Sequence, residues 1–423
     1  MDKEIKERIA AINSGIIPEG YKKTKVGIVP VEWETKTLGQ VLQRVSNAVN
    51  VENDIQYQQI GIRSHGKGLF YKEKVSGAEL GNKSVFWIEP DCFILNIVFA
   101  WEQAIGKTTK NEIGMIASHR FPMYKPQGID IDYLVFYFLT KRGNTLLELA
   151  SPGGAGRNKT LGQENFLNSK VILPPLPEQK KIAEIISTQD KLIELQEKKI
   201  EQLKELKKAY LQKMFPQKGS KYPELRFKGF TDPWEQRKFS DFTFAAGERN
   251  KDDLDLEPFA ITNNQGFIAQ SEVHDDFGYM KDVDRKMYIV VKPNSFAYNP
   301  ARINVGSLGY YEGAENVIVS SLYEVFQTAE YVDDKFLKHW FKTKAFQDWI
   351  ERLQEGSVRL YFYYDKLCEC IMSMPSVEEQ RKIGAYLDKI DNLITLHQRK
   401  SEQEKQKKKA LMQLLLTGIV RTK

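Results

Sequence analysis

Two long segments of the chain carry apolar residues at the spacing of an α-helix. In the first segment, residues 173–215, apolar side chains recur three, four or seven positions apart at Ile182, Ile186, Ile193, Ile200, Leu203 and Tyr210. Gln189, Gln196 and Lys207 stand between them. This pattern predicts a coiled-coil seam with polar interruptions, which can fix the register of two helices. A helix of roughly 36 residues would be about 54 Å long.

The second segment, residues 374–416, begins in the same way and then becomes polar. Its apolar positions are Ile383, Leu387, Ile390 and Ile394, followed by a charged run over 398–409 and an apolar end at Leu411, Leu414, Leu415 and Leu416. Ser376 is the predicted N-cap, and Gly418 marks the stop. Because a long exposed seam needs a partner, we expect the two helices to pack against each other. The apolar end is expected to pack on another subunit or on an N-terminal helix. The charged run is interpreted as a solvated face.

The two segments are copies of one another. Gln179 matches Gln380, Asp190 matches Asp391 and Ala209 matches Ala410, always 201 positions apart. The same offset relates Trp33 to Trp234 upstream. A constant offset over this distance indicates a repeated unit, in which a globular segment is followed by a long helix. The sequence Ser-Gly-Ile at 14–16 also resembles Thr-Gly-Ile at 417–419, which suggests that the termini lie close together.

The globular segments are predicted to mix helices and strands. Residues 85–98 and 286–300 are aromatic and β-branched runs broken by Pro and Asn, which favours strands with turns. Matching helices are expected to start at Asp132 and Asp333, and short strands are expected just before each long helix. The predicted fold class is α+β: two globular segments of mixed α/β structure, separated by two long coiled-coil helices in a pseudo-twofold repeat. The expected boundaries are 1–172, 173–221, 222–372 and 373–423, for first domain, central helix, second domain and distal helix.

Composition narrows the class of protein but does not identify the function. The 423 residues are 41% hydrophobic and 28% charged, as in ordinary soluble proteins, and the net charge of +6 permits an acidic partner without requiring one. Three cysteines cannot form a disulfide framework, the N-terminus does not resemble a signal peptide, and the longest apolar runs are too short to cross a bilayer. We therefore expect a cytoplasmic protein with no membrane segment.

Several motifs resemble catalytic sites but are incomplete. Gly106-Lys107-Thr108 lacks the leading glycine of a phosphate-binding loop. Asn299-Pro300-Ala301-Arg302 resembles the Asn-Pro-Pro-aromatic motif of DNA amino-methyltransferases without its second proline and its aromatic residue. Cys368 and Cys370 have no companions at zinc-ligand spacing, and on a strand both thiols would point into the core. The sequence predicts no catalytic residues, no metal site and no cofactor in this chain.

Residue types suited to DNA contact gather in glycine- and asparagine-rich segments. Lys and Arg position a protein on phosphates, whereas Arg and Asn also read base edges. The candidate DNA-binding residues are Arg63, Lys67, Lys107, Arg157, Asn158, Lys159, Arg249, Asn264, Arg302, Asn304 and Arg359. For each of them, the alternative interpretation is a solvated surface turn.

The residues around both helices resemble those of a known family. Pro174 to Ala183, reading PPLPEQKKIA, is similar to the central conserved region of type I restriction–modification specificity subunits, and Pro375 to Ile383 is similar to their distal conserved region. Trp33-Glu34, Trp234-Glu235 and Leu415 to Gly418 also resemble elements of that family. The resemblance covers the whole chain, and the duplicated order of variable and conserved segments is more specific than any single motif.

That resemblance implies a sequence-specific, non-catalytic subunit that binds double-stranded DNA. Each globular segment would be a target-recognition domain that reads one half of a bipartite target. The two long helices would pack antiparallel, set the spacing and dock two methyltransferase subunits. S-adenosylmethionine would be bound by those partners, and the complex can add restriction/translocase subunits that use ATP and Mg²⁺. Two alternatives are a methyltransferase or nuclease that acts as a single chain, and a coiled-coil scaffold with no DNA role.

Overall fold

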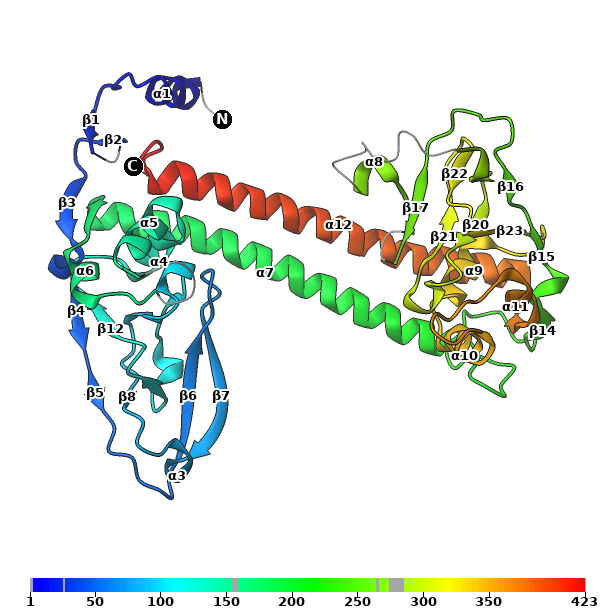
Figure 1. The fold of residues 1–423 in the computed structure, drawn as a ribbon, viewed down its shortest axis with the longest axis horizontal. Helices are drawn as coiled ribbons and strands as arrows, with labels where there is room; N and C mark the ends of the chain where they lie inside the picture. The colour runs from blue at the N-terminus through cyan, green and yellow to red at the C-terminus, as the bar shows by residue number, and fades with distance from the viewer. Residues whose placement is uncertain (1–2, 26, 154–158, 264–265, 274–284, 423) are drawn as a thin grey trace. The chain divides into compact units, whose positions relative to one another are not determined.

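The computed structural model describes residues 3–25, 27–153, 159–263, 266–273 and 285–422, and it divides into two compact units. The first unit comprises Met1–Gln196 with Lys400–Lys423, and the second comprises Glu197–Arg399. The two predicted long helices are confirmed as α7 (Leu176–Lys213) and α12 (Val377–Leu416), and Figure 1 shows both as uninterrupted helices. Each unit therefore contains a globular part and a stretch of each long helix.

Two antiparallel or mixed sheets form the globular part of the first unit. The four-stranded sheet has the order β10-β9-β12-β4 and the five-stranded sheet the order β5-β8-β11-β6-β7. Their strands are β4 (Leu42–Val45), β5 (Asn47–Ala48), β6 (Gln56–Ile62), β7 (Leu69–Ser76), β8 (Val85–Trp87), β9 (Phe93–Leu95), β10 (Ile105–Lys107), β11 (Ile116–Ser118) and β12 (Met123–Pro126). All their neighbouring strands are antiparallel except β11 and β6. The strands expected within residues 85–98 are present as β8 and β9.

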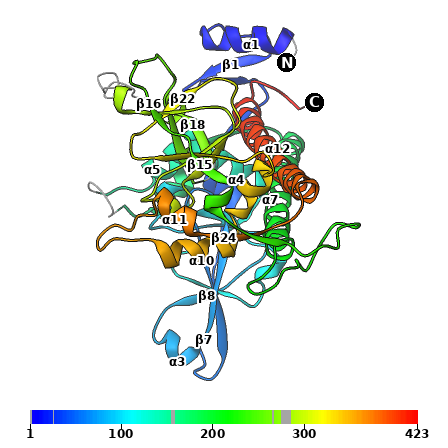
Figure 2. The ribbon, with the colours of Figure 1, turned by 90° about the vertical axis from the view of Figure 1, so that its right-hand side faces the viewer.

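The described part of the first unit also contains short helices. They are α1 (Lys3–Asn13), α2 (Leu38–Val41), α3 (Gly77–Leu80), α4 (Ile131–Leu139), α5 (Lys141–Leu149) and α6 (Gln163–Asn168). Of these, α2, α4, α5 and α6 share a core with the long helices. The small sheets pair β1 (Tyr21–Thr24) with β2 (Gly27–Pro30), and β3 (Glu34–Thr37) with β13 (Lys170–Leu173). Helix α3 lies at the end of the β6–β7 hairpin that is remote from α4 and α5 (Figures 1 and 2). The main core joins α4 and α6 to residues 182–186 of α7 and to Leu415 and Leu416 of α12.

The second unit repeats this plan with shorter sheets. Its sheet orders are β15-β23-β20-β21, β16-β19-β22, β17-β18 and β14-β24. The strands are β14 (Glu235–Lys238), β15 (Thr243–Ala245), β16 (Glu248–Arg249), β17 (Phe259–Thr262), β18 (Gly266–Ala269), β19 (Ile289–Val291), β20 (Ser295–Tyr298), β21 (Leu308–Tyr311), β22 (Val317–Val319), β23 (Glu324–Thr328) and β24 (Ile371–Met374). The helices are α8 (Gln270–Val273), α9 (Asp334–Trp340), α10 (Lys344–Leu353) and α11 (Tyr364–Glu369). The α+β fold class is thus confirmed.

In each unit one long helix lies against the other in antiparallel orientation, and the contacts repeat. In the first unit the Lys408 ammonium lies 2.6 Å from the Asp190 carboxylate. In the second unit the Lys207 ammonium lies 2.6 Å from the Asp391 carboxylate. Lys408 and Asp391 follow Lys207 and Asp190 by the same 201 positions as the sequence repeat, since 408 − 207 and 391 − 190 both equal 201. The charged run over 398–409, interpreted above as a solvated face, therefore contributes Lys408 to the helix pair.

One layer of the helix pair is polar in the first unit and apolar in the second. The Gln189 amide donates to the Glu404 side chain and, at 3.4 Å, to the Glu404 carbonyl. Their counterparts 201 positions away are Ile390 and Leu203, which are both buried. The repeat therefore preserves the packing position while changing its chemistry.

A buried glutamine fastens the start of each long helix to the globular part of its unit. The Gln179 side chain donates to the Pro174 carbonyl at 2.8 Å and accepts from the Asp130 backbone N–H at 2.9 Å. Gln380 makes the equivalent bonds to the Pro375 carbonyl and the Asp333 N–H, both at 2.9 Å. Both glutamines are almost fully buried. Because Asp130 and Asp333 cap α4 and α9, each glutamine ties a long helix to the cap of a short one.

The glutamate beside each of these glutamines is buried and paired with an arginine. Glu178 accepts from the Arg421 guanidinium at 2.6 and 2.8 Å, and Glu379 accepts from the Arg226 guanidinium at 2.7 and 2.8 Å. In both units the arginine follows the end of one long helix and the glutamate lies at the start of the other. Such two-point pairs fix orientation as well as charge.

Three details differ from or extend the sequence expectations. The helices α4 and α9 are offset by 203 positions rather than 201, since they follow the caps Asp130 and Asp333. Helix α4 begins at Ile131, so the expected start at Asp132 is one residue too late. The apolar end of α12 packs into the first unit's core, where Leu415 and Leu416 are buried. Cys368 lies in α11 and is half-buried, while only Cys370 is buried. This placement corrects the strand expected for both thiols.

The termini do lie together in the first unit, as their similar sequences suggested. The Tyr21 hydroxyl donates to the Gly418 carbonyl at 3.0 Å, and the Arg421 guanidinium contacts the Glu32 carboxylate. Gly418 itself has a φ of 76°, a left-handed conformation that favours glycine at this stop.

We predict that Gln179→Ala and Gln380→Ala each lower the free energy of unfolding by about 1–3 kcal/mol. Each substitution leaves a buried carbonyl and a backbone N–H without their partner. Gln212→Ala, on the exposed side of α7, is the control and should change stability by less than about 0.5 kcal/mol. Urea unfolding of the full chain measures all three, and equal effects in the three variants would contradict the assigned role of the buried glutamines.

Candidate nucleic-acid interface

A compact loop between β9 and β10 forms the centre of the candidate site in the first unit. The Asn96 side-chain oxygen accepts from the Val98 N–H at 3.0 Å, and the Asn96 carbonyl accepts from the Phe99 N–H at 3.1 Å. A single 3-10 turn, η1 (Ala100–Glu102), follows, and Gln103 closes it with a φ of 58°. The loop is therefore held by its own hydrogen bonds, with Phe99 exposed at its edge.

Two further segments of the first unit dock on this loop. The β6–β7 turn donates from the His65 N–H to the Glu102 carbonyl at 2.7 Å and from the Gly66 N–H to the Gln103 carbonyl at 2.9 Å. On another side, the Leu161 N–H donates to the Ile97 carbonyl at 2.8 Å.

The docked segments bring three of the predicted DNA-binding residues to one region. Arg63 and Lys67 are exposed on the β6–β7 turn, and the Arg63 guanidinium lies 5.1 Å from the Phe70 ring centroid. The Lys159 ammonium lies 5.2 Å from the Trp101 ring centroid. Cations near aromatic rings on adjoining loops suit both phosphate contact and base stacking.

The second unit builds the same arrangement between β20 and β21. The Asn299 side-chain oxygen accepts from the Ala301 N–H at 3.0 Å, the turn η6 (Ile303–Val305) follows, and Gly306 closes it with a φ of 95°. The Ser307 hydroxyl donates to the Ile261 carbonyl of β17 at 3.0 Å, which places the end of that strand beside the loop.

A second loop of this unit joins the first at Pro300, whose carbonyl accepts from the Phe362 N–H at 3.0 Å. Backbone hydrogen bonds of 2.8 Å in both directions between Glu355 and Tyr361 close this second loop at its base. It exposes Arg359, and Val358 beside it is 94% exposed.

Arg302, Asn304 and Arg359 are thus brought together on two adjoining loops, and all three are exposed. The predicted residues Arg157, Asn158 and Asn264 lie outside the described residues.

Two predicted residues lie on other elements. The Lys107 ammonium, at the end of β10, is 2.5 Å from the Asp132 carboxylate, so part of its charge is compensated within the chain. Arg249 lies on the short strand β16, where its guanidinium approaches the Met287 sulfur at 4.0 Å. Both remain predicted DNA-binding residues, although they lie outside the three-segment site.

We use the name three-segment site for the central loop of each unit together with the two segments that dock on it. These segments are the β6–β7 turn and the segment of Leu161 in the first unit, and the end of β17 and the Arg359 loop in the second.

Sequence reasoning missed Phe99 and Trp101, which lie on the central loop of the first unit. The run of apolar residues around them favoured a strand continuing past Asn96. The signal that could have revealed them is the match of Asn96 with Asn299, which holds only at an offset of 203 and was hidden by the offset of 201 found elsewhere.

Comparison with known proteins gives a consistent result over both units. The model of the type I restriction modification DNA specificity domain matches residues 30–205 and again 233–406. The chain belongs to this specificity family. It is similar to the type I restriction enzyme MjaVIII specificity subunit of Methanocaldococcus jannaschii, with 24% identity over 96% of this chain and 97% of the relative. A putative MjaX specificity subunit of the same organism is 26% identical over the same shares.

A solved structure of similar fold is the type I restriction-modification system S subunit from M. genitalium. It has a TM-score of 0.52 at 12% identity and covers 92% of this chain and 96% of that chain. At this identity the likeness concerns the fold alone. Among the described residues of this specificity-family chain, no helix is both long enough and apolar enough to cross a membrane.

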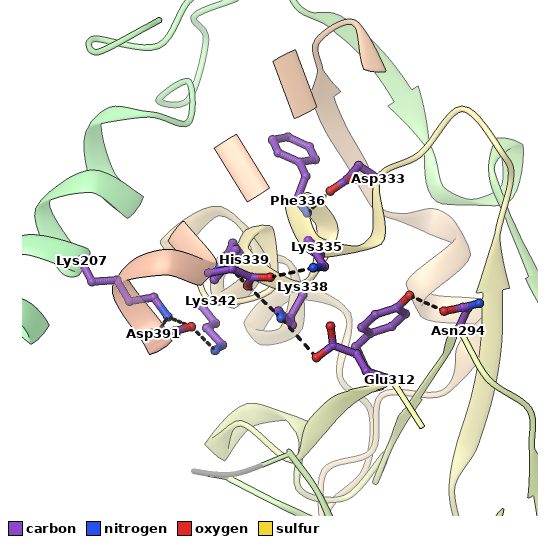
Figure 3. Close-up of polar contacts among 12 residues, drawn as sticks. Lys207, Asn294, Glu312, Asp333, Lys335, Phe336, Lys338, His339, Lys342 and Asp391 are labelled. Carbon is purple, nitrogen blue, oxygen red and sulfur yellow. Dashed lines mark hydrogen bonds and ion pairs between the residues drawn. The ribbon is translucent and has the colours of Figure 1, made fainter. Parts of the chain in front are cut away.

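A charged cluster joins α9 to the long helices within the second unit of this specificity-family chain (Figure 3). The fully buried His339 lies with its Nε2 2.9 Å from an Asp388 carboxylate oxygen, and the same oxygen lies 2.9 Å from the Lys338 ammonium. Beside them, Asp391 contacts Lys207 at 2.6 Å and Lys342 at 3.7 Å.

The pKa values of this cluster follow from burial and charge. Burial lowers the pKa of His339, and the neighbouring Lys207 and Lys342 lower it further against the opposing effect of Asp388. Burial and Lys342 lower the pKa of Lys207 to about 8, so its amine still carries a charge at neutral pH. Burial opposes ionisation of Asp388, yet hydrogen bonds from His339 and Lys338 hold the pKa of its carboxyl well below the usual range.

His339, Asp388 and Asp391 have ligand atoms within 4.8 Å of one another, a separation that a metal ion could bridge. However, lysine ammonium groups already contact both carboxylates. A further cation would have to displace or approach these positive charges. The chemistry of the cluster therefore fits an internal ion-pair network better than a metal site.

The first unit carries an apolar version of the same contact. Phe136 stands where the second unit has His339, 203 positions later, and Ser187 stands where it has Asp388, 201 positions later. The Lys408 ammonium, bound to Asp190, lies 5.5 Å from the Phe136 ring centroid. Phe136 and Ser187 therefore show which side chains could replace His339 and Asp388 in a variant of the second unit.

We predict that His339→Phe combined with Asp388→Ser flattens the loss of stability between pH 7 and pH 5. The unfolded chain binds a proton at His339 near its ordinary pKa of about 6.5, while the folded chain binds it only at lower pH. Stability therefore falls as the pH drops below about 6.5, by about 1.4 kcal/mol for each unit of pKa difference. Thermal unfolding of wild type and variant across this range measures the slope.

The control is His119→Phe, because His119 is exposed and lies outside this cluster. Asp388 does not confuse the result, since the stability contributed by a carboxyl of lowered pKa is lost only below about pH 4. An identical pH slope in the wild type and the double variant would contradict the assigned protonation of His339.

Proposed function

We propose that this chain is the non-catalytic, sequence-specific DNA-recognition subunit of a type I restriction–modification system. Each globular part reads one half of a bipartite target in double-stranded DNA. The observation that supports this most strongly is the three-segment site, which occurs in both units with exposed cationic or aromatic residues on adjoining loops. Two similar sites with different exposed side chains suit two half-sites of different sequence.

We propose that the long helices set the separation of the two half-sites. Helix α7 contributes residues to both units, and its 38 residues correspond to roughly 57 Å of helix. An α-helix resists stretching, so a long helix can fix a distance. In other DNA-binding proteins the geometry of the dimer fixes the spacing of two half-sites in the same way. Repeated ion pairs in each unit, Lys408 with Asp190 and Lys207 with Asp391, hold the register of the helices on which this spacing would depend.

We propose that the same helices bind two methyltransferase subunits. Leu192 and Leu195 of α7 are 39% and 60% exposed, and Leu393 and Leu396 of α12 are 36% and 46% exposed. The two pairs are related by 201 positions. Within each pair the two leucines are three positions apart, so they lie on the same face of their helix. An apolar patch duplicated with the repeat fits one kind of partner bound twice.

The chemistry of methylation would belong to those partners. S-adenosylmethionine would bind to the methyltransferase subunits, and ATP with Mg²⁺ to restriction/translocase subunits where these join the complex. A cytoplasmic location would give the assembly access to the cell's DNA.

We predict that replacing residues 20–172 with the matching segment of another specificity subunit changes one half of the methylated sequence. The other half and the spacing should stay the same, because the second unit and both long helices are unchanged. Mapping methylated bases in DNA from cells that contain the chain and its methyltransferase subunits measures this. An unchanged sequence, or methylation by the chain without partners, would contradict the proposed function.

We predict that Leu195→Glu and Leu396→Glu each reduce the number of bound methyltransferase subunits from two to one, and that the double variant binds none. A carboxylate in an apolar contact carries a desolvation cost that weakens binding. Leu206→Glu is the matched control, because Leu206 is 41% exposed on α7 and its counterpart in the repeat is Lys407. Native mass spectrometry counts the subunits, and two partners bound to both single variants would exclude this surface.

A further inference from the structure

The central loops of the two units repeat each other bond for bond. At an offset of 203, every backbone hydrogen bond within residues 96–105 has a counterpart within residues 299–308. The donor and acceptor pairs of the first loop are Asn96 to Ala104, Phe99 to Asn96, Glu102 to Phe99, Gln103 to Ala100, Ala104 to Phe99 and Ile105 to Gln103. The side-chain bond of the asparagine is also repeated, at 3.0 Å in both loops.

The backbone angles agree at the position that precedes the 3-10 turn. Phe99 has φ −125° and ψ 20°, and Arg302 has φ −134° and ψ 8°. After the turn, Gln103 and Gly306 both adopt the left-handed conformation that reverses the chain. The two loops are therefore one scaffold that is built from different sequences.

The side chains inside the scaffold are buried in both loops, whereas those that face solvent differ in chemistry. Ala100 and Ile303 are buried at equivalent positions, as are Ala104 and Ser307. In contrast, an exposed phenylalanine at 99 corresponds to an exposed arginine at 302.

The next outward position shows the same contrast. Trp101 of the first loop corresponds to the exposed Asn304 of the second. The Trp101 ring is half-buried, and its N–H donates to the Val98 carbonyl at 3.1 Å. Its ring remains near the Lys159 ammonium. The first loop thus presents aromatic surface with a cation nearby, and the second presents a guanidinium and an amide.

We propose that this loop is the specificity-determining element of each unit, with Phe99 and Arg302 as equivalent base-reading positions. The proposal rests on the DNA-recognition function proposed above and assigns it to particular residues. A scaffold closed by its own hydrogen bonds can carry different exposed side chains without refolding. The first unit reads its half-site through aromatic and apolar contact, and the second reads its half-site through hydrogen bonds to base edges.

The chemistry of the two side chains gives each unit a different class of target. An arginine can donate two hydrogen bonds to O6 and N7 of guanine, and an asparagine can bond the edge of adenine in the same groove. A phenylalanine makes no such bonds, but it contacts the thymine methyl group or stacks on an exposed base. The half-site of the second unit should therefore contain a guanine that Arg302 recognises, whereas that of the first unit should not depend on a donor at this position.

The neighbouring loops place cations beside positions 99 and 302, which suits contact with a nucleic-acid ligand. In the second unit the Phe362 N–H fixes the Arg359 loop to the carbonyl of Pro300, two residues before Arg302. In the first unit the β6–β7 turn with Arg63 and Lys67 is fixed to Glu102 and Gln103. Cations on these flanking segments supply phosphate contacts, which orient the central loop toward the bases.

The test is a reciprocal exchange at the two equivalent positions, Phe99→Arg and Arg302→Phe. Both side chains are exposed and both backbones have nearly the same angles, so neither exchange should alter folding, which thermal unfolding checks. Each full chain is assembled with its methyltransferase subunits. Binding is then measured by competition with duplexes that carry the methylated target, the target with its first half scrambled, or the target with its second half scrambled.

We expect Arg302→Phe to reduce discrimination against the scrambled second half by about 10- to 100-fold while discrimination at the first half is retained. Phe99→Arg should change discrimination at the first half alone. Arg249→Ala, on a different element of the second unit, should weaken binding to all three duplexes equally or leave it unchanged.

Two results would overturn the assignment. One is wild-type discrimination at both halves in both exchanged variants. The other is an equal loss for all duplexes, including complete loss of binding, because it would make Phe99 and Arg302 general contacts. If the wild-type complex methylates no bipartite sequence, the proposed function fails, and this outcome is separate from a failure of the exchange.

Discussion

The apolar seams of the two long helices are the constraint on which both units depend. A helix of 38 residues with a stripe of isoleucine and leucine is not stable alone in water, because its seam must be covered. In each unit the seam is covered by the other long helix and by a short helix of the globular part. The buried glutamines, Gln179 and Gln380, fix the orientation of the packed helices, since each joins the start of a long helix to the cap of α4 or α9. Apolar burial supplies most of the stability, whereas these hydrogen bonds define the angle at which the globular part meets the helix.

Comparison of the duplicated contacts shows which contacts of the helix pair keep their chemistry in both units and which change from polar to apolar. Glu178 with Arg421 and Glu379 with Arg226 retain both charge and two-point bonding, because removal of one partner would leave a buried charge. The layer of Gln189 and Glu404 corresponds to the apolar layer of Ile390 and Leu203. Likewise, Phe136 and Ser187 correspond to the His339–Asp388 pair. Complete exchange of a polar pair for an apolar pair leaves no group unsatisfied, so the fold tolerates it.

The sequence predicted the long helices, their pairing and the α+β class, because these follow from patterns that extend over many residues. The antiparallel orientation of the helices was implied by the resemblance to specificity subunits. It also identified Arg63, Lys67 and Lys159 in the first unit, and Arg302, Asn304 and Arg359 in the second, as candidate contacts. It could not show that each group lies on adjoining loops, since hydrogen bonds such as Gly66 to Gln103 and Phe362 to Pro300 join residues distant in sequence. Phe99 escaped notice for a different reason. Its apolar neighbours resemble a strand, and the insertion of two residues relative to the rest of the repeat obscured its equivalence to Arg302.

The repeat offset differs by two residues between parts of the chain that pack against different elements. The helices and their flanks keep the offset of 201, because Lys207, Asp190 and their counterparts must meet across the helix pair. From the central loops to the caps at Asp130 and Asp333 the offset is 203, and it returns to 201 where Leu161 and Phe362 dock on Ile97 and Pro300. The length change is absorbed between these points, in the segments containing α5 and α10. Exposed positions such as 99 and 302 can consequently change chemistry, because the hydrogen bonds that shape the loop use backbone groups and the buried or half-buried asparagine. A fold of this kind allows the sequence that is recognised to diverge without altering the helix pair that holds the two units.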